Sequence, residues 1–117
     1  MYTIRQDFRF EAAHRLPLYD GDCKRIHGHS YRFEIAVSSE TLDEQGMVMD
    51  FRDISHVVEE RAVNRLDHQY LNDFFENPTA ENLAKWIFDQ IGELNPEYVE
   101  VWESEKASVR YTPDNQK

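Results

Sequence analysis

The first stretch of the chain alternates between apolar and polar positions. Over residues 2–14 the even-numbered positions are mostly apolar or aromatic, whereas the odd-numbered positions before residue 12 are polar or charged. A period of two is typical of a strand with one buried face. His14 shares its parity with Phe8 and Phe10, so a strand that continues that far unbroken points His14 inward.

A second alternation predicts another strand. Residues 31–38 place aromatic and aliphatic side chains at odd positions and mostly polar ones between them. His27 and His29 lie just upstream with the same odd parity. A spacing of two near a strand points both imidazoles to one side of the chain.

Apolar positions at intervals of three and four residues predict two helices. Asp50 or Asp53 can cap a first helix, which runs to about Leu66. Thr79 can cap a second helix, whose apolar positions continue to about Leu94.

The pattern returns to alternation at residues 98–103 and 107–111, which predicts two further strands. The expected order is strand, strand, helix, helix, strand, strand. This order indicates an α+β fold, in which a four-stranded antiparallel sheet carries two helices on one face. Such a sheet has two open edges, so pairing between subunits is expected.

The length of 117 residues corresponds to a single domain, residues 1–117. Thirteen basic against 23 acidic residues give a net charge of −10, which argues against nucleic acid or an anionic membrane as a partner. No apolar run is long enough to span a bilayer, and the first residues do not resemble a secretion signal. With one cysteine and hence no intrachain disulfide, we expect a cytoplasmic protein.

Three of the five histidines form a candidate metal site. His27 and His29 lie in a His-x-His pair, and His14 lies at the end of an adjacent predicted strand. Three neutral imidazoles with an open fourth position describe a catalytic zinc site. The alternative is that these are separate surface or hydrogen-bonding histidines. His56 falls within the first predicted helix and is interpreted as a solvated or packing residue.

Cys23 lies four residues before His27 in a polar loop. It could be a fourth zinc ligand, a catalytic thiol or an inert small residue. Lys24 and Arg25 follow it and would favour the thiolate, so the sequence favours a catalytic role.

An acidic residue and a histidine that follow the first predicted helix are candidate acid–base groups. Asp67 and His68 follow the first helix, either as a polar helix end or as an acid–base relay. Adjacent side chains diverge on most backbones, so direct contact between them is not assured.

Glu103 continues the apolar parity of its strand, so it either emerges at the strand end or anchors a ligand with two N–H donors.

Five motifs in order resemble the 6-pyruvoyl-tetrahydropterin synthase/QueD family, and the resemblance covers almost the whole chain. They are Phe10-Glu11-Ala12-Ala13-His14-Arg15-Leu16, Cys23-x3-His27-Gly28-His29, Leu66-Asp67-His68, Pro78-Thr79-Ala80-Glu81-Asn82 and Glu103. The three-residue gap between Cys23 and His27 resembles the QueD branch, whose members make 6-carboxy-tetrahydropterin from 7,8-dihydroneopterin triphosphate.

The resemblance implies a role for each matching residue. His14, His27 and His29 would hold zinc, and Cys23 would take or deliver a proton. Asp67 and His68 would form a relay supplied by a neighbouring subunit. Glu103 would grip the pterin ring, and Thr79 and Glu81 would face it as a lesser contact. The family fold is the T-fold, which assembles into a barrel, usually a homohexamer built from two trimers.

Two alternatives stay open at this point. The first is 6-pyruvoyl-tetrahydropterin synthase, which eliminates triphosphate from the same substrate. The second is a non-catalytic subunit that binds zinc or pterin, because a fold alone does not establish activity.

Overall fold

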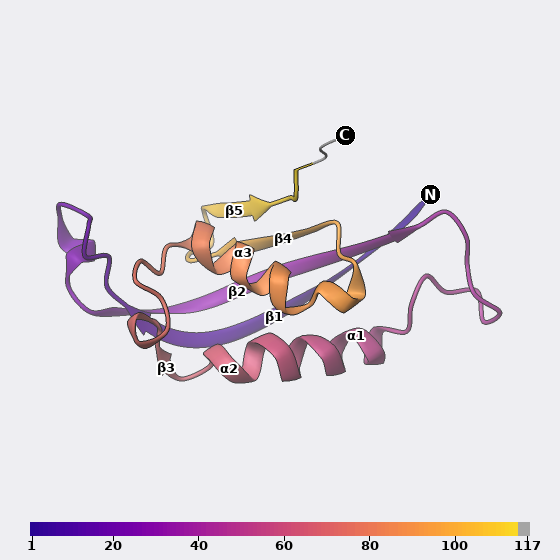
Figure 1. Ribbon diagram of the computed structural model, residues 1–117, viewed down its shortest axis with the longest axis horizontal. Coiled ribbons are helices and arrows are strands. Elements are labelled where there is room, and N and C mark those ends of the chain that lie inside the picture. The colour runs from indigo at the N-terminus through magenta and orange to yellow at the C-terminus, as the bar shows by residue number, and fades with distance from the viewer. Residues whose placement is uncertain (115–117) are drawn as a thin grey trace.

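A computed structural model describes residues 1–114 as a sheet with helices on one face (Figure 1). The strands are β1 (Tyr2–His14), β2 (His27–Ser39), β3 (Gln69–Tyr70), β4 (Tyr98–Trp102) and β5 (Ser108–Tyr111). The helices are α1 (Phe51–Val58), α2 (Asn64–Leu66) and α3 (Ala80–Gln90), and a π-helical segment, Glu59–Val63, joins the first two. Short 3-10 turns lie at Asp22–Lys24, Leu71–Asp73 and Gly92–Leu94.

The strand order is β3-β1-β2-β4-β5. β1 and β2 form a long antiparallel pair, and β4 and β5 extend it with the same antiparallel sense. β3 lies parallel to β1 beside Ala12 and Ala13. The expected sheet of four antiparallel strands is therefore wrong in its count, because a two-residue strand is too short to produce a sequence period.

Both expected helices are present, but α3 ends at Gln90 rather than at about Leu94, and a separate 3-10 turn covers Gly92–Leu94. The Asp50 carboxylate accepts from the Arg52 amide at 2.9 Å, and the Thr79 hydroxyl accepts from the Asn82 amide at 3.1 Å. Each interaction satisfies an amide that has no partner within the first helical turn. The first helical stretch ends at Leu66, as the apolar spacing predicted.

The core lies between the sheet and the helices. Its sheet side is made of the even positions of β1 and the odd positions of β2, with Phe8 stacked on Phe33 and Phe10 on Tyr31 at 5.3 and 4.8 Å between ring centroids. His14 lies on this face with 1% of its surface exposed, as the parity of β1 predicted.

The opposite face of the sheet carries polar and aromatic side chains. Arg32 stacks on Trp102 at 3.6 Å and pairs with Asp7 at 3.0 Å. Arg110 stacks on Tyr98 at 3.7 Å. Among the described residues, no helix has the length and apolar character needed to cross a membrane.

Candidate metal centre and adjoining pocket

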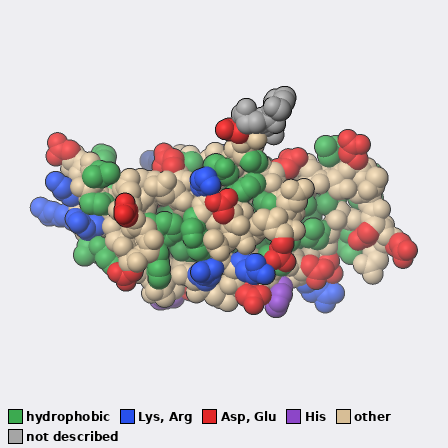
Figure 2. All heavy atoms as spheres, viewed as in Figure 1, with side chains coloured by type: hydrophobic (Ala, Val, Ile, Leu, Met, Phe, Trp, Pro, Cys, Tyr) green, Lys and Arg blue, Asp and Glu red, His purple; other side chains and the backbone are tan. Residues whose placement is uncertain are grey.

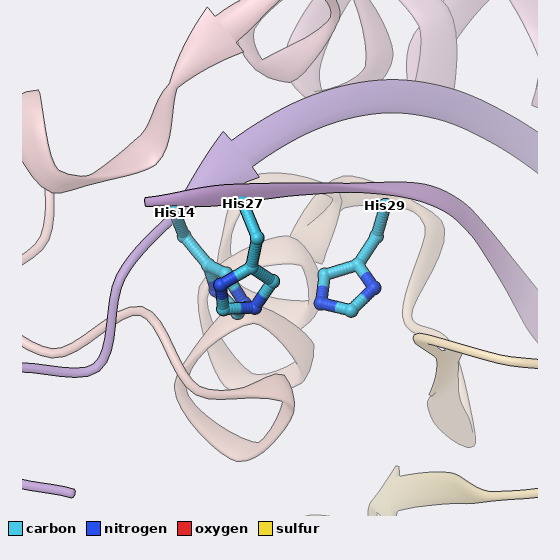
Figure 3. A group of neighbouring side chains, drawn as sticks. All are labelled: His14, His27 and His29. Atoms are coloured by element: carbon cyan, nitrogen blue, oxygen red, sulfur yellow. The ribbon is translucent and has the colours of Figure 1, made fainter. Parts of the chain in front are cut away.

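Three histidines converge at one end of the sheet (Figure 3). His14 comes from the last position of β1, and His27 and His29 come from the start of β2. His14 lies opposite His27 in the strand register. One ring nitrogen from each histidine lies within 4.8 Å of the others. The prediction that the three imidazoles approach one point is confirmed.

Backbone carbonyls fix the orientation of two rings. His14 Nδ1 lies 2.8 Å from the Pro78 carbonyl, and His27 Nδ1 lies 2.7 Å from the Arg25 carbonyl. A carbonyl can only accept, so each Nδ1 carries the proton and donates it. Each Nε2 is therefore left with a lone pair, which is the form that binds a metal ion.

The two Nε2 atoms of His14 and His27 are 3.1 Å apart. Two lone pairs facing each other at this distance repel unless a proton or a cation lies between them. Zinc–nitrogen bonds of about 2.0–2.1 Å at a tetrahedral angle place two ligand atoms roughly 3.3 Å apart. The geometry and the neutral nitrogen donors thus fit a zinc ion.

Burial favours the neutral forms of His14 and His29. Burial lowers the pKa of His14, and it also lowers the pKa of His29, although the negative charge of Glu103 opposes both shifts. The Tyr31 hydroxyl, fully buried, lies 3.2 Å from His14 Nδ1. Tyr31 was not among the predicted site residues, although it lies two residues after His29 on β2 and its side chain points to the same face.

A pocket of about 320 Å³ adjoins the metal centre. His29 lines it together with Thr79, Glu81 and Glu103. β4 ends at Trp102, so Glu103 directly follows the strand. The structure therefore brings together three residues that the sequence had placed in two distant motifs. Within residues 1–114 no ion pair within 4.0 Å engages the Glu103 carboxylate.

Cys23 lies in the short turn between β1 and β2 and is partly exposed. Its carbonyl accepts from the Leu16 amide at 2.7 Å. Among the described residues, the metal-binding group consists of the three histidines without Cys23. The arrangement thus does not support the interpretation of Cys23 as a fourth ligand.

Asp67 and His68 are in direct contact, with Asp67 Oδ2 3.0 Å from His68 Nδ1. His68 adopts a left-handed backbone conformation at this contact, with φ of 61°. The Glu11 amide donates to Asp67 Oδ1 at 2.9 Å, and the His68 amide donates to the Glu11 carbonyl at 2.6 Å. The Glu11 amide and the contact with His68 lower the pKa of Asp67, which favours its ionised form.

His68 lies at a different cavity from Glu103. His68 lines a pocket of about 550 Å³ with Glu11, Ser30 and Tyr70, and His29 borders it as well. Thr79, Glu81 and Glu103 line the other pocket. The exposed His56, with 81% of its side chain accessible, lies outside the metal-binding group, as the sequence predicted.

The fold is that of a tetrahydropterin synthase. The structure is similar to that of the Caenorhabditis elegans 6-pyruvoyl tetrahydropterin synthase, with a TM-score of 0.86 and 26% identity over 97% of this chain and 96% of that one. The family model for 6-pyruvoyl tetrahydropterin synthase matches residues 3–114. The chain belongs to this family.

Two curated relatives have different activities. A 6-carboxy-5,6,7,8-tetrahydropterin synthase from Synechocystis sp. is 42% identical, over 95% of this chain and 93% of the relative. A dihydroneopterin monophosphate aldolase from Pyrococcus furiosus is 34% identical, over 86% of this chain and 88% of the relative.

Proposed function

We propose that this protein is a zinc-dependent 6-carboxy-5,6,7,8-tetrahydropterin synthase. It would convert 7,8-dihydroneopterin triphosphate and one water molecule to 6-carboxy-tetrahydropterin, acetaldehyde and triphosphate, a carbon–carbon lyase reaction that feeds queuosine and other deazapurine biosynthesis. The observation that carries the proposal is the 42% identity to the Synechocystis synthase over nearly the full length of both chains. The convergence of His14, His27 and His29 supports it.

His14, His27 and His29 would hold the zinc ion through ring nitrogens. When bound, zinc supplies Lewis acidity that lowers the pKa of the substrate hydroxyls. The carbonyls of Pro78 and Arg25 keep two of the rings in the required tautomer.

Glu103 would anchor the pterin ring. Its carboxylate lines the pocket next to His29 and can accept two N–H bonds from the ring's amide and amino edge. Thr79 and Glu81 line the same pocket and would contact the ring less directly. Ala80 also lines this pocket and offers no hydrogen-bonding side chain to the ring.

Cys23, Asp67 and His68 would move protons. The Cys23 thiol would take or deliver a proton at the substrate side chain, and the His68 imidazole would act as acid and base while Asp67 orients it. Because His68 and Glu103 line different pockets of one subunit, we propose that the complete site forms between subunits.

A barrel-shaped homohexamer of two trimers would provide this site. β3 covers β1 only at Ala12 and Ala13, so most of β1 is an edge within the described chain, and β5 is the other edge. Unpaired strand edges favour pairing with a neighbouring sheet.

Product identification with purified, zinc-loaded protein tests the proposal. Incubation with 7,8-dihydroneopterin triphosphate should release acetaldehyde and the 6-carboxy product. A 6-pyruvoyl product without acetaldehyde would support the alternative that the family model's description and the C. elegans structure favour. Because the Pyrococcus relative is a dihydroneopterin monophosphate aldolase, dihydroneopterin monophosphate must be the second substrate in this assay.

Removal of zinc with a chelator tests whether the protein is an enzyme or a non-catalytic binding subunit. Turnover should be lost on removal of zinc and return when zinc is added back. A protein that binds zinc and pterin without turnover under either condition would be a binding module instead.

A further inference from the structure

The loop between β1 and β2 carries three cations beside the candidate metal centre. Arg15 directly follows His14, and Lys24 and Arg25 precede His27. Figure 2 shows Lys and Arg side chains gathered at the end of the molecule where Figure 1 places this loop. In a chain with a net charge of −10, such a group produces a local field opposite to the overall one.

The main chain anchors this loop. The Asn72 side chain accepts from the Arg15 amide and donates to the Arg15 carbonyl, both at 2.9 Å. The Leu16 amide donates to the Cys23 carbonyl at 2.7 Å. These anchors use no cationic head group, so the loop can hold its shape while the charged side chains remain available.

The three head groups lack acidic partners. Within residues 1–114 no carboxylate lies within 4.0 Å of the Arg15, Lys24 or Arg25 charges, including those of Asp20 and Asp22 in the same loop. The Arg15 guanidinium instead reaches the Lys24 carbonyl at 3.4 Å. Neighbouring cations without counterions repel one another, and a bound polyanion removes that repulsion.

The loop also borders the site. The Arg25 carbonyl orients the His27 ring at 2.7 Å. Leu16 lines the 320 Å³ pocket together with His29 and Glu103. An anion held by the loop therefore lies next to the metal centre and next to the pocket proposed for the ring.

We infer that Arg15, Lys24 and Arg25 bind the phosphate chain of the substrate and set how many phosphates the site accepts. This inference rests on the proposed function, which supplies a phosphorylated substrate. A chain of three phosphates carries more negative charge than a single phosphate, so a loop with three unpaired cations favours the longer chain.

The test compares the binding of inorganic tripolyphosphate and orthophosphate by calorimetry on zinc-loaded protein. The variant combines Arg15→Gln, Lys24→Gln and Arg25→Gln, which remove the charges and keep the backbone anchors. Tripolyphosphate affinity should fall roughly 10- to 100-fold, given the usual contribution of exposed charges. The loss of affinity with added salt should also become less steep than in the original protein.

Arg9→Gln is the matched control. Arg9 is exposed on β1, and within the described chain its guanidinium also has no ion pair within 4.0 Å. Its removal lowers the total charge in the same direction but should leave tripolyphosphate affinity within about twofold. Equal losses in both variants, or an unchanged affinity in the triple variant, would overturn the inference. If the triple variant does not fold, Lys24→Gln alone, at an exposed position, gives the same comparison.

The outcomes separate this inference from the proposed function. Weakened tripolyphosphate binding without acetaldehyde release from the pterin supports the phosphate site and rejects the proposed reaction. Acetaldehyde release with unchanged tripolyphosphate binding supports the reaction and rejects the phosphate site.

Discussion

His68 holds its proposed role at a cost in backbone energy. Among the described residues, His68 and Asn95 are the non-glycine residues with positive φ, at 61° and 52°. Histidine and asparagine occur in this region more often than most other non-glycine residues, but only glycine has no steric penalty there. The His68 ring contacts the Asp67 carboxylate from this conformation, so a modest backbone strain coincides with a proposed catalytic contact.

Replacement of His68 by Gly should therefore stabilise the protein and inactivate it. Relief of the left-handed conformation should add about 1 kcal/mol to the free energy of unfolding, or roughly 3 °C in Tm. Turnover should fall about 100-fold or more through loss of the acid–base group. Calorimetry at fixed protein concentration and a product assay measure the two effects. A lower Tm in His68→Gly would contradict the assignment of strain.

Cys23→Ala should keep zinc and lose turnover. The thiol lies outside the three-histidine group, so zinc content by elemental analysis should stay at one ion per chain. His27→Ala is the comparison, because it removes a ligand and should lose metal and activity together. Loss of stoichiometric zinc in Cys23→Ala would make the thiol a ligand, and an active, zinc-loaded His27→Ala protein would reject the histidine site.

The histidine site predicts a pH dependence of the metal-free protein. Burial lowers the pKa of His14 and His29 in the folded state below the unfolded value of 6.5. Below pH 6.5 the unfolded chain therefore binds more protons, and the free energy of unfolding falls as the pH decreases. Tm measured from pH 7.5 to 5.0 should show this loss. It should shrink in His14→Gln and persist in His56→Gln, whose ring is exposed; the reverse would contradict the assignment.

At the scale of elements, Thr79 caps α3 where the helix begins, and it also lines the pocket of about 320 Å³ next to His29. Thr79→Ala removes the hydroxyl that accepts from Asn82, so it should cost about 1 kcal/mol of stability. Thr79→Ser retains the capping hydroxyl, so its free energy of unfolding should stay within a few tenths of a kcal/mol of that of the original protein. Denaturant unfolding measures both variants. Equal stability of all three proteins would show that the cap contributes nothing here.

Most of the architecture follows from short periodicities. The alternations of β1 and β2 and the caps of Asp50 and Thr79 were sufficient to predict the long strands and both helical stretches. The inward orientation of His14 followed from the same parity. These features are local, and local pattern is what a sequence displays most directly.

The remaining features depend on contacts that are distant in sequence. β3 spans two residues and exists because β1 offers an edge, so its own sequence carries no period. The contact between Asp67 and His68 depends on one backbone angle and on hydrogen bonds to Glu11. The proximity of Glu103 to Thr79 requires α3 and β4 to be packed together, which no local pattern reveals.

At the scale of the whole molecule, the residues proposed to act on the substrate line two different cavities of a single chain. His68 lines one and Glu103 lines the other. A mixture of inactive Cys23→Ala and His68→Ala subunits should recover part of the activity if one subunit's relay serves its neighbour's pocket. Native mass spectrometry must show mixed oligomers; such oligomers without any recovered activity would reject the shared site.

The same register between β1 and β2 brings the candidate metal ligands together and aligns the aromatic side chains of the core. His14 opposite His27 and Phe10 opposite Tyr31 belong to one continuous ladder. A slip of one residue would turn every side chain of the slipped strand to the other face, and would remove a ligand and the aromatic stacks together. Zinc uptake therefore reports correct refolding. Insertions within these strands should be tolerated, if at all, only in pairs, whereas the loop between His14 and His27 lies outside the ladder and carries no such restriction.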